Sequence, residues 1–203
     1  MDILLVVLFS YFSGSIPFGL ILTKIFANQD VRNIGSGNIG ATNVLRTGKK
    51  FLAVITLILD VAKGYLPVLA TQYFFTEHLQ ISAIFAFLGH IFPIWLKFKG
   101  GKGVATYLGI LFALSYSLGI LFVFTWIIVS LIFKYSSLSS IFSSLTVLMV
   151  TVLRENAVKA IDPNFAYTSN IKLILFIFFI LIVFTHRKNI YNLKNRTEQK
   201  IKL

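Results

Sequence analysis

Glycines and polar side chains are concentrated in a short stretch between two long apolar runs, at residues 35–46. Its sequence is Gly35-Ser36-Gly37-Asn38-Ile39-Gly40-Ala41-Thr42-Asn43-Val44-Leu45-Arg46. Glycines let the backbone turn tightly and direct its N–H groups toward a ligand. The neutral polar side chains add hydrogen-bonding groups, and the arginine adds a planar fork suited to phosphate or carboxylate. We therefore expect an anion site beside a membrane, with these candidate ligands: Ser36, Asn38, Thr42, Asn43 and Arg46.

A second polar stretch, residues 97–103, contains Gly100-Gly101-Lys102-Gly103 directly before a helix that we expect to begin at Val104. Backbone N–H groups, a helix N-terminus and a lysine together suit a phosphate. The stretch is not a Walker A loop, because GxxxxGK[ST] is absent. A basic turn that only orients the protein in the membrane explains the same residues, and both interpretations stay open.

Two charged residues, Asp60 and Lys63, lie inside the apolar run that follows the first stretch. Their spacing of three places them on one helix face, where they can pair. Ionisable residues inside a span are costly and by default suggest function. A buried structural ion pair is an equally good interpretation, and Lys63 is also a candidate substrate ligand.

His186 and Asn189 lie one helical turn apart, where the last apolar run gives way to a basic tail. The histidine can act as a base or donate to a phosphate, although a histidine at the membrane interface explains it alone. Glu198 is the only acid in the tail, which favours a brace for a basic partner over a catalyst.

Several other chemistries are excluded by residues that the sequence lacks. There is no Cys, and the three His are too scattered for a zinc motif. The acids are too few and dispersed for a two-metal site, and the GxSxG and HxxxxD patterns are missing. Residues 35–40 match GxGxxG, but no strand precedes them, so a dinucleotide site is discarded. We expect neither a metal nor a cofactor.

Composition defines the class of protein. Of the 203 residues, 57% are hydrophobic and 13% are charged, whereas a soluble domain carries about 25% charged residues. Long apolar runs in such a chain predict an integral membrane protein. The net charge is +12, and the Lys and Arg residues that produce it lie in short loops and the tail. This distribution indicates that they orient the protein in the membrane and contact lipid headgroups, and it does not indicate nucleic-acid binding.

The apolar runs predict an all-α polytopic protein with about seven transmembrane helices. Residues 104–133 would make one helix of roughly 45 Å, too long for a membrane core of about 30 Å, and the small polar residues near Ser115 and Gly119 favour two short spans. The expected spans are Ile3–Ile25 with a bend near Pro17, Phe51–Phe75, Ile81–Leu96, two within Val104–Phe133, Leu138–Leu153 and Ile171–Thr185. A polar loop is expected over Arg154–Asn170.

The distribution of Lys and Arg supports seven spans over six. With seven, nearly all loop and tail cations fall on one face; with six, they divide more evenly. The positive-inside rule then places the N-terminus outside and the C-terminus in the cytoplasm. All three polar stretches emerge on the cytoplasmic face and can converge in one site, so residues 1–203 are expected to form a single transmembrane domain.

With these stretches assembled, the chain resembles the PlsY family of bacterial membrane acyl-phosphate:glycerol-3-phosphate acyltransferases. The resemblance covers nearly the whole chain in the right order. It rests on Ser13–Gly19, Gly35–Asn43 with Arg46, Asp60–Gly64, Gly89-His90 with Pro93, Lys99–Thr106, His186–Ile190 and Glu198.

This resemblance implies acyl transfer from acyl phosphate to the sn-1 hydroxyl of glycerol 3-phosphate, at the cytoplasmic side of the bacterial inner membrane. The donor is expected from a separate phosphate acyltransferase, with possible transient contact; membrane lipids are the other partner and nucleic acid is not one. The resemblance implies a phosphate loop at Gly100, Gly101, Lys102 and Gly103. We expect glycerol 3-phosphate at Arg46, Ser36 and the nearby asparagines, with His186 and Asn189 completing the site. A transporter of a small phosphorylated anion is the alternative.

Overall fold

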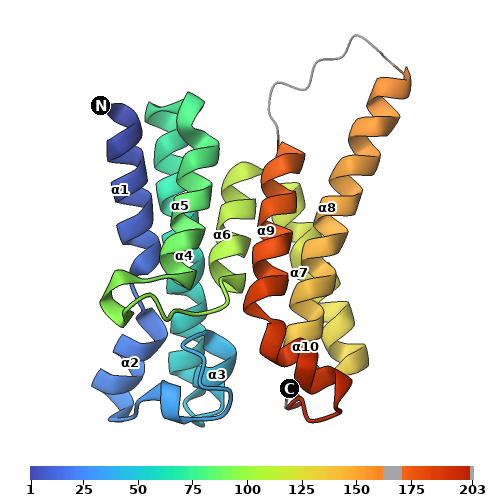
Figure 1. Cartoon of the computed structure of the whole chain (residues 1–203). Helices are drawn as coiled ribbons and strands as arrows, with labels where there is room; N and C mark the ends of the chain where they lie inside the picture. The colour runs from blue at the N-terminus through green and yellow to red at the C-terminus, as the bar shows by residue number, and fades with distance from the viewer. Residues whose placement is uncertain (162–170, 202–203) are drawn as a thin grey trace. The chain divides into compact units, whose positions relative to one another are not determined.

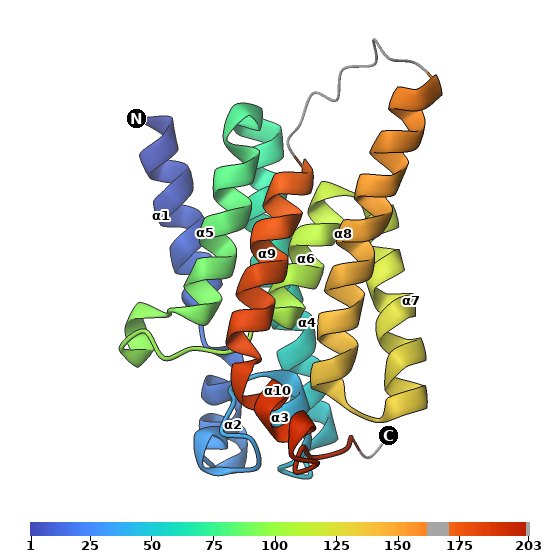
Figure 2. The ribbon, with the colours of Figure 1, turned by 45° about the vertical axis from the view of Figure 1, so that its right-hand side comes forward.

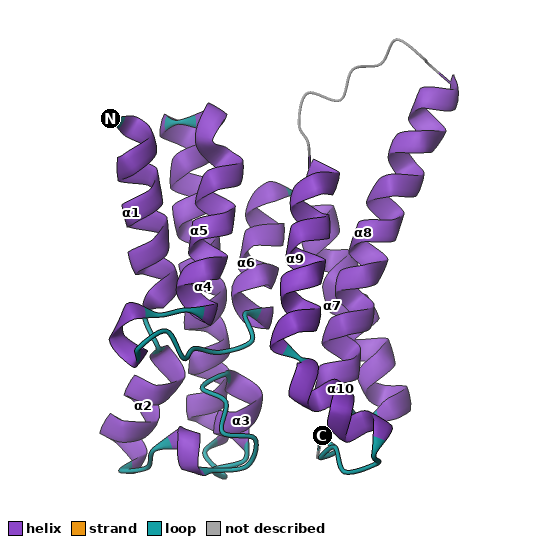
Figure 3. Cartoon of the chain, viewed as in Figure 1, coloured by secondary structure: helices purple, strands orange, loops and turns teal. Residues whose placement is uncertain are grey.

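The computed structural model describes residues 1–161 and 171–201 (Figure 1). All regular structure in those residues is helical, as Figure 3 shows, which confirms the predicted all-α class. The chain divides into two compact units, residues 1–119 and 120–203. Helix α7 (Tyr116–Phe133) begins in the first unit and continues in the second.

The first apolar run forms two helices, α1 (Asp2–Ser15) and α2 (Phe18–Ala27). The helix breaks at Ile16–Pro17, because proline lacks an N–H and disfavours helical geometry in the residue before it. This break agrees with the bend expected near Pro17. Ile16 is accordingly extended, at φ −65° and ψ 117°. At this break the Ile16 carbonyl accepts hydrogen bonds from the backbone N–H of Phe18 at 3.1 Å and from Nζ of Lys63 at 2.7 Å.

Three further helices complete the first unit together with the start of α7: α4 (Lys50–Phe74), α5 (Leu79–Ile91) and α6 (Val104–Leu114). Helix α1 packs on α5, and α4 packs on α6. Two loops lie on the side of this unit where α4 begins and α5 ends (Figure 1). The first loop connects α2 to α4, and the second connects α5 to α6. The first loop, residues 28–49, holds the 3₁₀ turn Val31–Asn33 and the short helix α3 (Ala41–Leu45); the second loop, residues 92–103, holds the 3₁₀ turn Ile94–Leu96.

The second unit contains the rest of α7 with α8 (Ser136–Ile161), α9 (Ile171–Thr185) and α10 (Arg187–Lys194). Helices α8 and α9 lie side by side in both views (Figures 1 and 2). An ion pair of 2.7 Å between Glu155 and Lys172 joins them. The predicted loop over Arg154–Asn170 is therefore wrong for residues 154–161, which continue α8; residues 162–170 lie outside the described part.

Five helical segments among the described residues are long and apolar enough to cross a membrane, where Asp2–Ala27 and Thr76–Leu96 each count as one segment. The number is six if α9 and α10, bent by 59°, form one span. The predicted break near Ser115 is confirmed, since this residue separates α6 from α7. Helix α6, with 11 residues, is shorter than the roughly 20 residues that a straight span needs. The chain is thus a multi-pass membrane protein, while the count of seven and the orientation of the termini stay predictions.

Candidate functional site

Asn43 is the organising residue of the first loop. Its side chain is buried, with 2% exposure, and its amide nitrogen lies 2.8 Å from the carbonyl oxygen of Val31, 2.9 Å from that of Ile34 and 2.7 Å from that of Asn38. The loop turns around this one amide, because three segments direct their carbonyls at it. In this structure Asn43 therefore shapes the loop; direct contact with substrate stays a prediction.

The side-chain oxygen of Asn43 holds two of the other candidate ligands. It accepts hydrogen bonds from the backbone N–H of Ser36 at 3.0 Å and from the Ser36 hydroxyl at 3.2 Å. Nη1 of Arg46 approaches the same oxygen at 3.4 Å. Gly35 is required beside them, because its φ is +54° and a Cβ there would meet both Asn43 and Arg46. Ser36 and Arg46 are thus held at one point of the loop, while Thr42 lies half-buried in α3.

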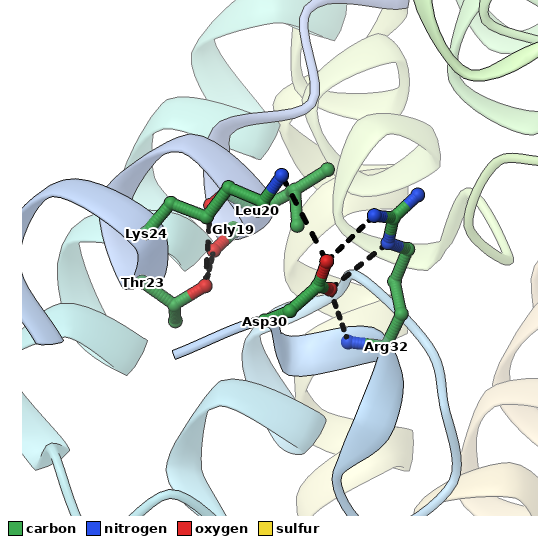
Figure 4. Close-up of polar contacts among 6 residues, drawn as sticks. All are labelled: Gly19, Leu20, Thr23, Lys24, Asp30 and Arg32. Carbon is green, nitrogen blue, oxygen red and sulfur yellow. Dashed lines mark hydrogen bonds and ion pairs between the residues drawn. The ribbon is translucent and has the colours of Figure 1, made fainter. Parts of the chain in front are cut away.

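An ion-pair cluster fixes the start of the first loop to the end of α2 (Figure 4). Asp30 accepts hydrogen bonds from Nε and Nη2 of Arg32 at 2.9 and 2.6 Å, and from the Arg32 backbone N–H at 3.0 Å. Lys24 of α2 lies 3.8 Å from the same carboxylate. The hydrogen bonds from Arg32, helped by both positive charges, lower the pKa of the Asp30 carboxyl to about 2. This cluster was not predicted from the sequence, although an acid between two nearby cations was a visible signal.

In the second loop, two glycines are engaged with the end of α5. The N–H of Gly100 donates to the carbonyl of Ile91, and the N–H of Gly101 donates to the carbonyl of His90, both at 3.2 Å. We expected these N–H groups to face a phosphate, but here they are directed at α5. The phosphate-binding role of the loop stays a prediction that now rests on Lys102, which is partly exposed, and on the first turn of α6, which begins after Gly103.

The ion pair expected from the spacing of Asp60 and Lys63 is confirmed. Nζ of Lys63 lies 2.7 Å from Oδ1 of Asp60, and both side chains are buried. The same ammonium donates to the Ile16 carbonyl and lies 5.6 Å from the ring centre of Phe18. The pair therefore secures the break between α1 and α2, and contact of Lys63 with a substrate stays a prediction.

His186 is held in one ring orientation in the second unit. It is buried, with 1% exposure, and its Nδ1 lies 2.8 Å from the Ile182 carbonyl. A carbonyl can only accept, so Nδ1 carries a proton. When the ring is neutral, Nε2 therefore has the lone pair that a general base requires.

Asn189 is fixed by the tail that follows it. Its amide donates to Oε1 of Glu198 at 2.7 Å, and the Ser137 hydroxyl donates to the same oxygen at 2.8 Å. Asn192 approaches Oε2 at 3.5 Å. Glu198 is therefore a brace, as expected, but these partners are amides and a hydroxyl where a basic group was anticipated.

The predicted residues thus lie in four places: the first loop, the second loop, the buried Lys63 of α4, and the start of the tail. The first three belong to one unit and the fourth to the other. In the residues that the structure describes, no cluster of three or more His, Cys, Asp or Glu side chains has a metal-binding arrangement.

Comparison with known proteins identifies the family. A family model described as glycerol-3-phosphate acyltransferase matches residues 4–196. The chain is 52% identical over 203 residues to a glycerol-3-phosphate acyltransferase of Pelagibacter ubique (strain HTCC1062), covering 100% of both. It is 46% identical over 203 residues to one of Wolbachia pipientis, covering 98% of this chain and 99% of the relative.

Solved structures agree with this assignment. A crystal structure of PlsY, an integral membrane glycerol 3-phosphate acyltransferase in its glycerol 3-phosphate form, matches with a TM-score of 0.89 at 34% identity, covering 100% of this chain and 96% of the other. The lysophosphatidic acid form of PlsY matches with a TM-score of 0.85 at 32% identity, covering 98% and 95%. The protein described here therefore belongs to the PlsY family of integral membrane glycerol-3-phosphate acyltransferases.

Proposed function

We propose that this chain transfers a fatty acyl group from acyl phosphate to the sn-1 hydroxyl of glycerol 3-phosphate, releasing lysophosphatidic acid and inorganic phosphate. The observation that carries the proposal is the Asn43 network of the first loop, in a member of this family. It holds a hydroxyl and a guanidinium together at one side-chain oxygen of the loop itself. Such preorganised groups suit an anionic substrate, because little ordering remains when it binds.

The proposed reaction needs positioning more than strong acid or base chemistry. The hydroxyl oxygen attacks the acyl carbonyl carbon, a C–O ester bond forms, and the bond from that carbon to the phosphate oxygen breaks. The hydroxyl proton passes either to Nε2 of His186 or to an oxygen of the donor phosphate. Because phosphate is a good leaving group, holding both substrates and offsetting their negative charges supplies most of the catalysis.

Each group of residues has a proposed role. Arg46 and Ser36 bind glycerol 3-phosphate, with Asn38, Thr42 and Lys63 as further candidate contacts. Lys102 and the first turn of α6 bind a phosphate beside the second loop. His186 and Asn189 complete the site from the tail, and residues 1–203 act as a single catalytic domain.

The membrane arrangement belongs to the same proposal. We infer seven spans with the N-terminus outside, and a site that faces the cytoplasm at the bacterial inner membrane. The short α6 counts there as a span. A site at this surface suits a soluble glycerol 3-phosphate and a donor whose chain lies in lipid, made by a separate phosphate acyltransferase. Transient contact with that enzyme is part of the proposal.

A donor comparison with purified protein tests the proposal. Glycerol 3-phosphate is offered with acyl phosphate, acyl-CoA or acyl carrier protein thioester in parallel, without added metal. We expect product only from acyl phosphate, with the acyl group at sn-1. Transfer from a thioester alone contradicts the donor assignment. Uptake of labelled glycerol 3-phosphate into sealed vesicles without acylation supports the transporter alternative instead.

A further inference from the structure

His90, at the end of α5, contacts both ends of the glycine-rich segment of the second loop. It is buried, with 3% exposure. Its carbonyl accepts the N–H of Gly101 at 3.2 Å, and its Nδ1 lies 2.9 Å from the hydroxyl oxygen of Thr106, in the first turn of α6. One residue therefore connects the start of the segment with the helix that follows it.

The two glycines meet different parts of His90. A Cβ on Gly101 would overlap Nε2 of the imidazole ring. A Cβ on Gly100 would instead overlap the main-chain carbonyl oxygen of His90, and would also meet Pro93. Because a carbonyl persists in every substitution of His90 and the ring does not, the two contacts can be separated by mutation.

The far side of this contact is also closely packed. The carbonyl of Thr106 lies against Gly64 of α4, where a Cβ would overlap it. The first turn of α6 is thus held between α4 and the His90 ring. Its position, and the direction of its N–H groups, depend on both neighbours.

We propose that His90 is a positioning residue for the phosphate-binding segment 100–106. Its ring sets the path of the backbone at Gly101, and its bond to Thr106 orients the first turn of α6. This inference rests on the proposed function, since it assumes that the segment binds a phosphate of the substrates. On this inference, position 101 must be glycine because a larger side chain would collide with the imidazole ring of His90, and not because the phosphate itself approaches closely.

A double-mutant cycle tests this assignment through the Kd for glycerol 3-phosphate and the Kd for acyl phosphate, both measured by calorimetry, and through acyl transfer. In the wild-type background, we expect Gly101→Ala to weaken binding of at least one of the two substrates about tenfold or more, a coupling typical of residues in contact. In a His90→Ala background, the same change should cost less than about twofold, because the obstructing ring is gone. An equal loss in both backgrounds overturns the proposal.

Gly100→Ala is the matched control. Its obstacle is the main-chain oxygen of residue 90, which His90→Ala keeps, so its loss should be equal in the two backgrounds. Rescue of Gly100→Ala as well would show that His90→Ala merely loosens the loop, and would also overturn the assignment.

A second pair of variants leaves the histidine in place, in case His90→Ala does not fold. Thr106→Val removes the hydroxyl at nearly constant shape; Thr106→Ser keeps it. We expect Thr106→Val to raise the KM for glycerol 3-phosphate or for acyl phosphate about tenfold with kcat within about twofold, and Thr106→Ser to restore it. An unchanged KM for both substrates in a folded Thr106→Val protein contradicts the orienting bond. Absence of wild-type turnover defeats the proposed function, whereas the binding cycle still reports on His90.

Discussion

Replacing Asn43 by Asp changes one atom type at the centre of the first loop. The aspartate has the same shape as asparagine but has no amide hydrogens. The carbonyl oxygens of Val31, Ile34 and Asn38, at 2.7–2.9 Å from the amide nitrogen, would then face an oxygen. The substitution therefore removes the donor and adds repulsion without changing side-chain volume.

The cost follows from the number of hydrogens. An amide has two, so at most two strong bonds are shared among the three carbonyls. Losing two bonds costs about 1 kcal/mol each, and leaving buried carbonyls beside a carboxylate adds about 1 kcal/mol or more. We expect the free energy of opening of the loop to fall by about 3 kcal/mol, which is roughly a hundredfold in an opening equilibrium.

Amide hydrogen exchange of residues 34–46 in the substrate-free protein measures this opening. We expect exchange in Asn43→Asp to accelerate roughly a hundredfold where opening limits it, with a rise in the KM for glycerol 3-phosphate. Asn33→Asp is the control, because it makes the same chemical change at an exposed position of the same loop and should leave exchange nearly unchanged. If Asn43→Asp impairs binding while substrate-free exchange stays at the wild-type rate, Asn43 is a direct ligand and our reasoning is refuted.

Four further outcomes are expected. Lys63→Met leaves Asp60 buried without its ion-pair partner and should destabilise the protein by about 3–5 kcal/mol in thermal or denaturant unfolding, with partial recovery in Asp60→Asn/Lys63→Met; equal stability of Lys63→Met and wild type would contradict a structural pair. Arg46→Ala should raise the KM for glycerol 3-phosphate at least about tenfold, and a normal KM would remove this residue from the site. If His186 takes the proton, both His186→Ala and His186→Gln should lose about 100-fold or more in turnover, whereas full activity in Gln leaves the proton to the donor phosphate. The stabilising effect of Asp30 should be complete above the pKa of 3.8 that its carboxyl has in the unfolded chain, and it should vanish as the pH falls to about 2. The difference in melting temperature between wild type and Asp30→Asn should therefore close over that pH range. A constant difference would contradict the lowered pKa.

Features that depend on local sequence were predictable. The helical class and the break at Ser115 follow from the length of apolar runs, and the pairing of Asp60 with Lys63 follows from a spacing of three. The end of α8 was not predicted, because it depends on a tertiary contact and not on local sequence. The polar residues at 154–161 resembled a loop, but Glu155 pairs with Lys172 of the neighbouring helix, and this contact outweighs the local composition.

The internal construction of the candidate site was not predictable, because its contacts join distant residues. The sequence shows that Asn43 and Gly101 are present, but both also fit a direct ligand. Only the fold brings the Val31 carbonyl to the amide of Asn43, 12 residues away, and the His90 ring to Gly101. Glycine-rich and amide-rich segments suit ligands and tight packing equally well, so their composition alone does not separate the two roles.

The proposed function requires all three polar segments, in the first loop, the second loop and the tail, to emerge on the same, inner face of the membrane. The chain contains no native cysteine, so single cysteines at the exposed positions Lys49, Lys99 and Lys188 can be labelled with a membrane-impermeant maleimide in intact cells and in inverted vesicles. We expect all three to react in inverted vesicles and none in intact cells. Labelling of any one of them from the outer face would contradict a shared cytoplasmic site.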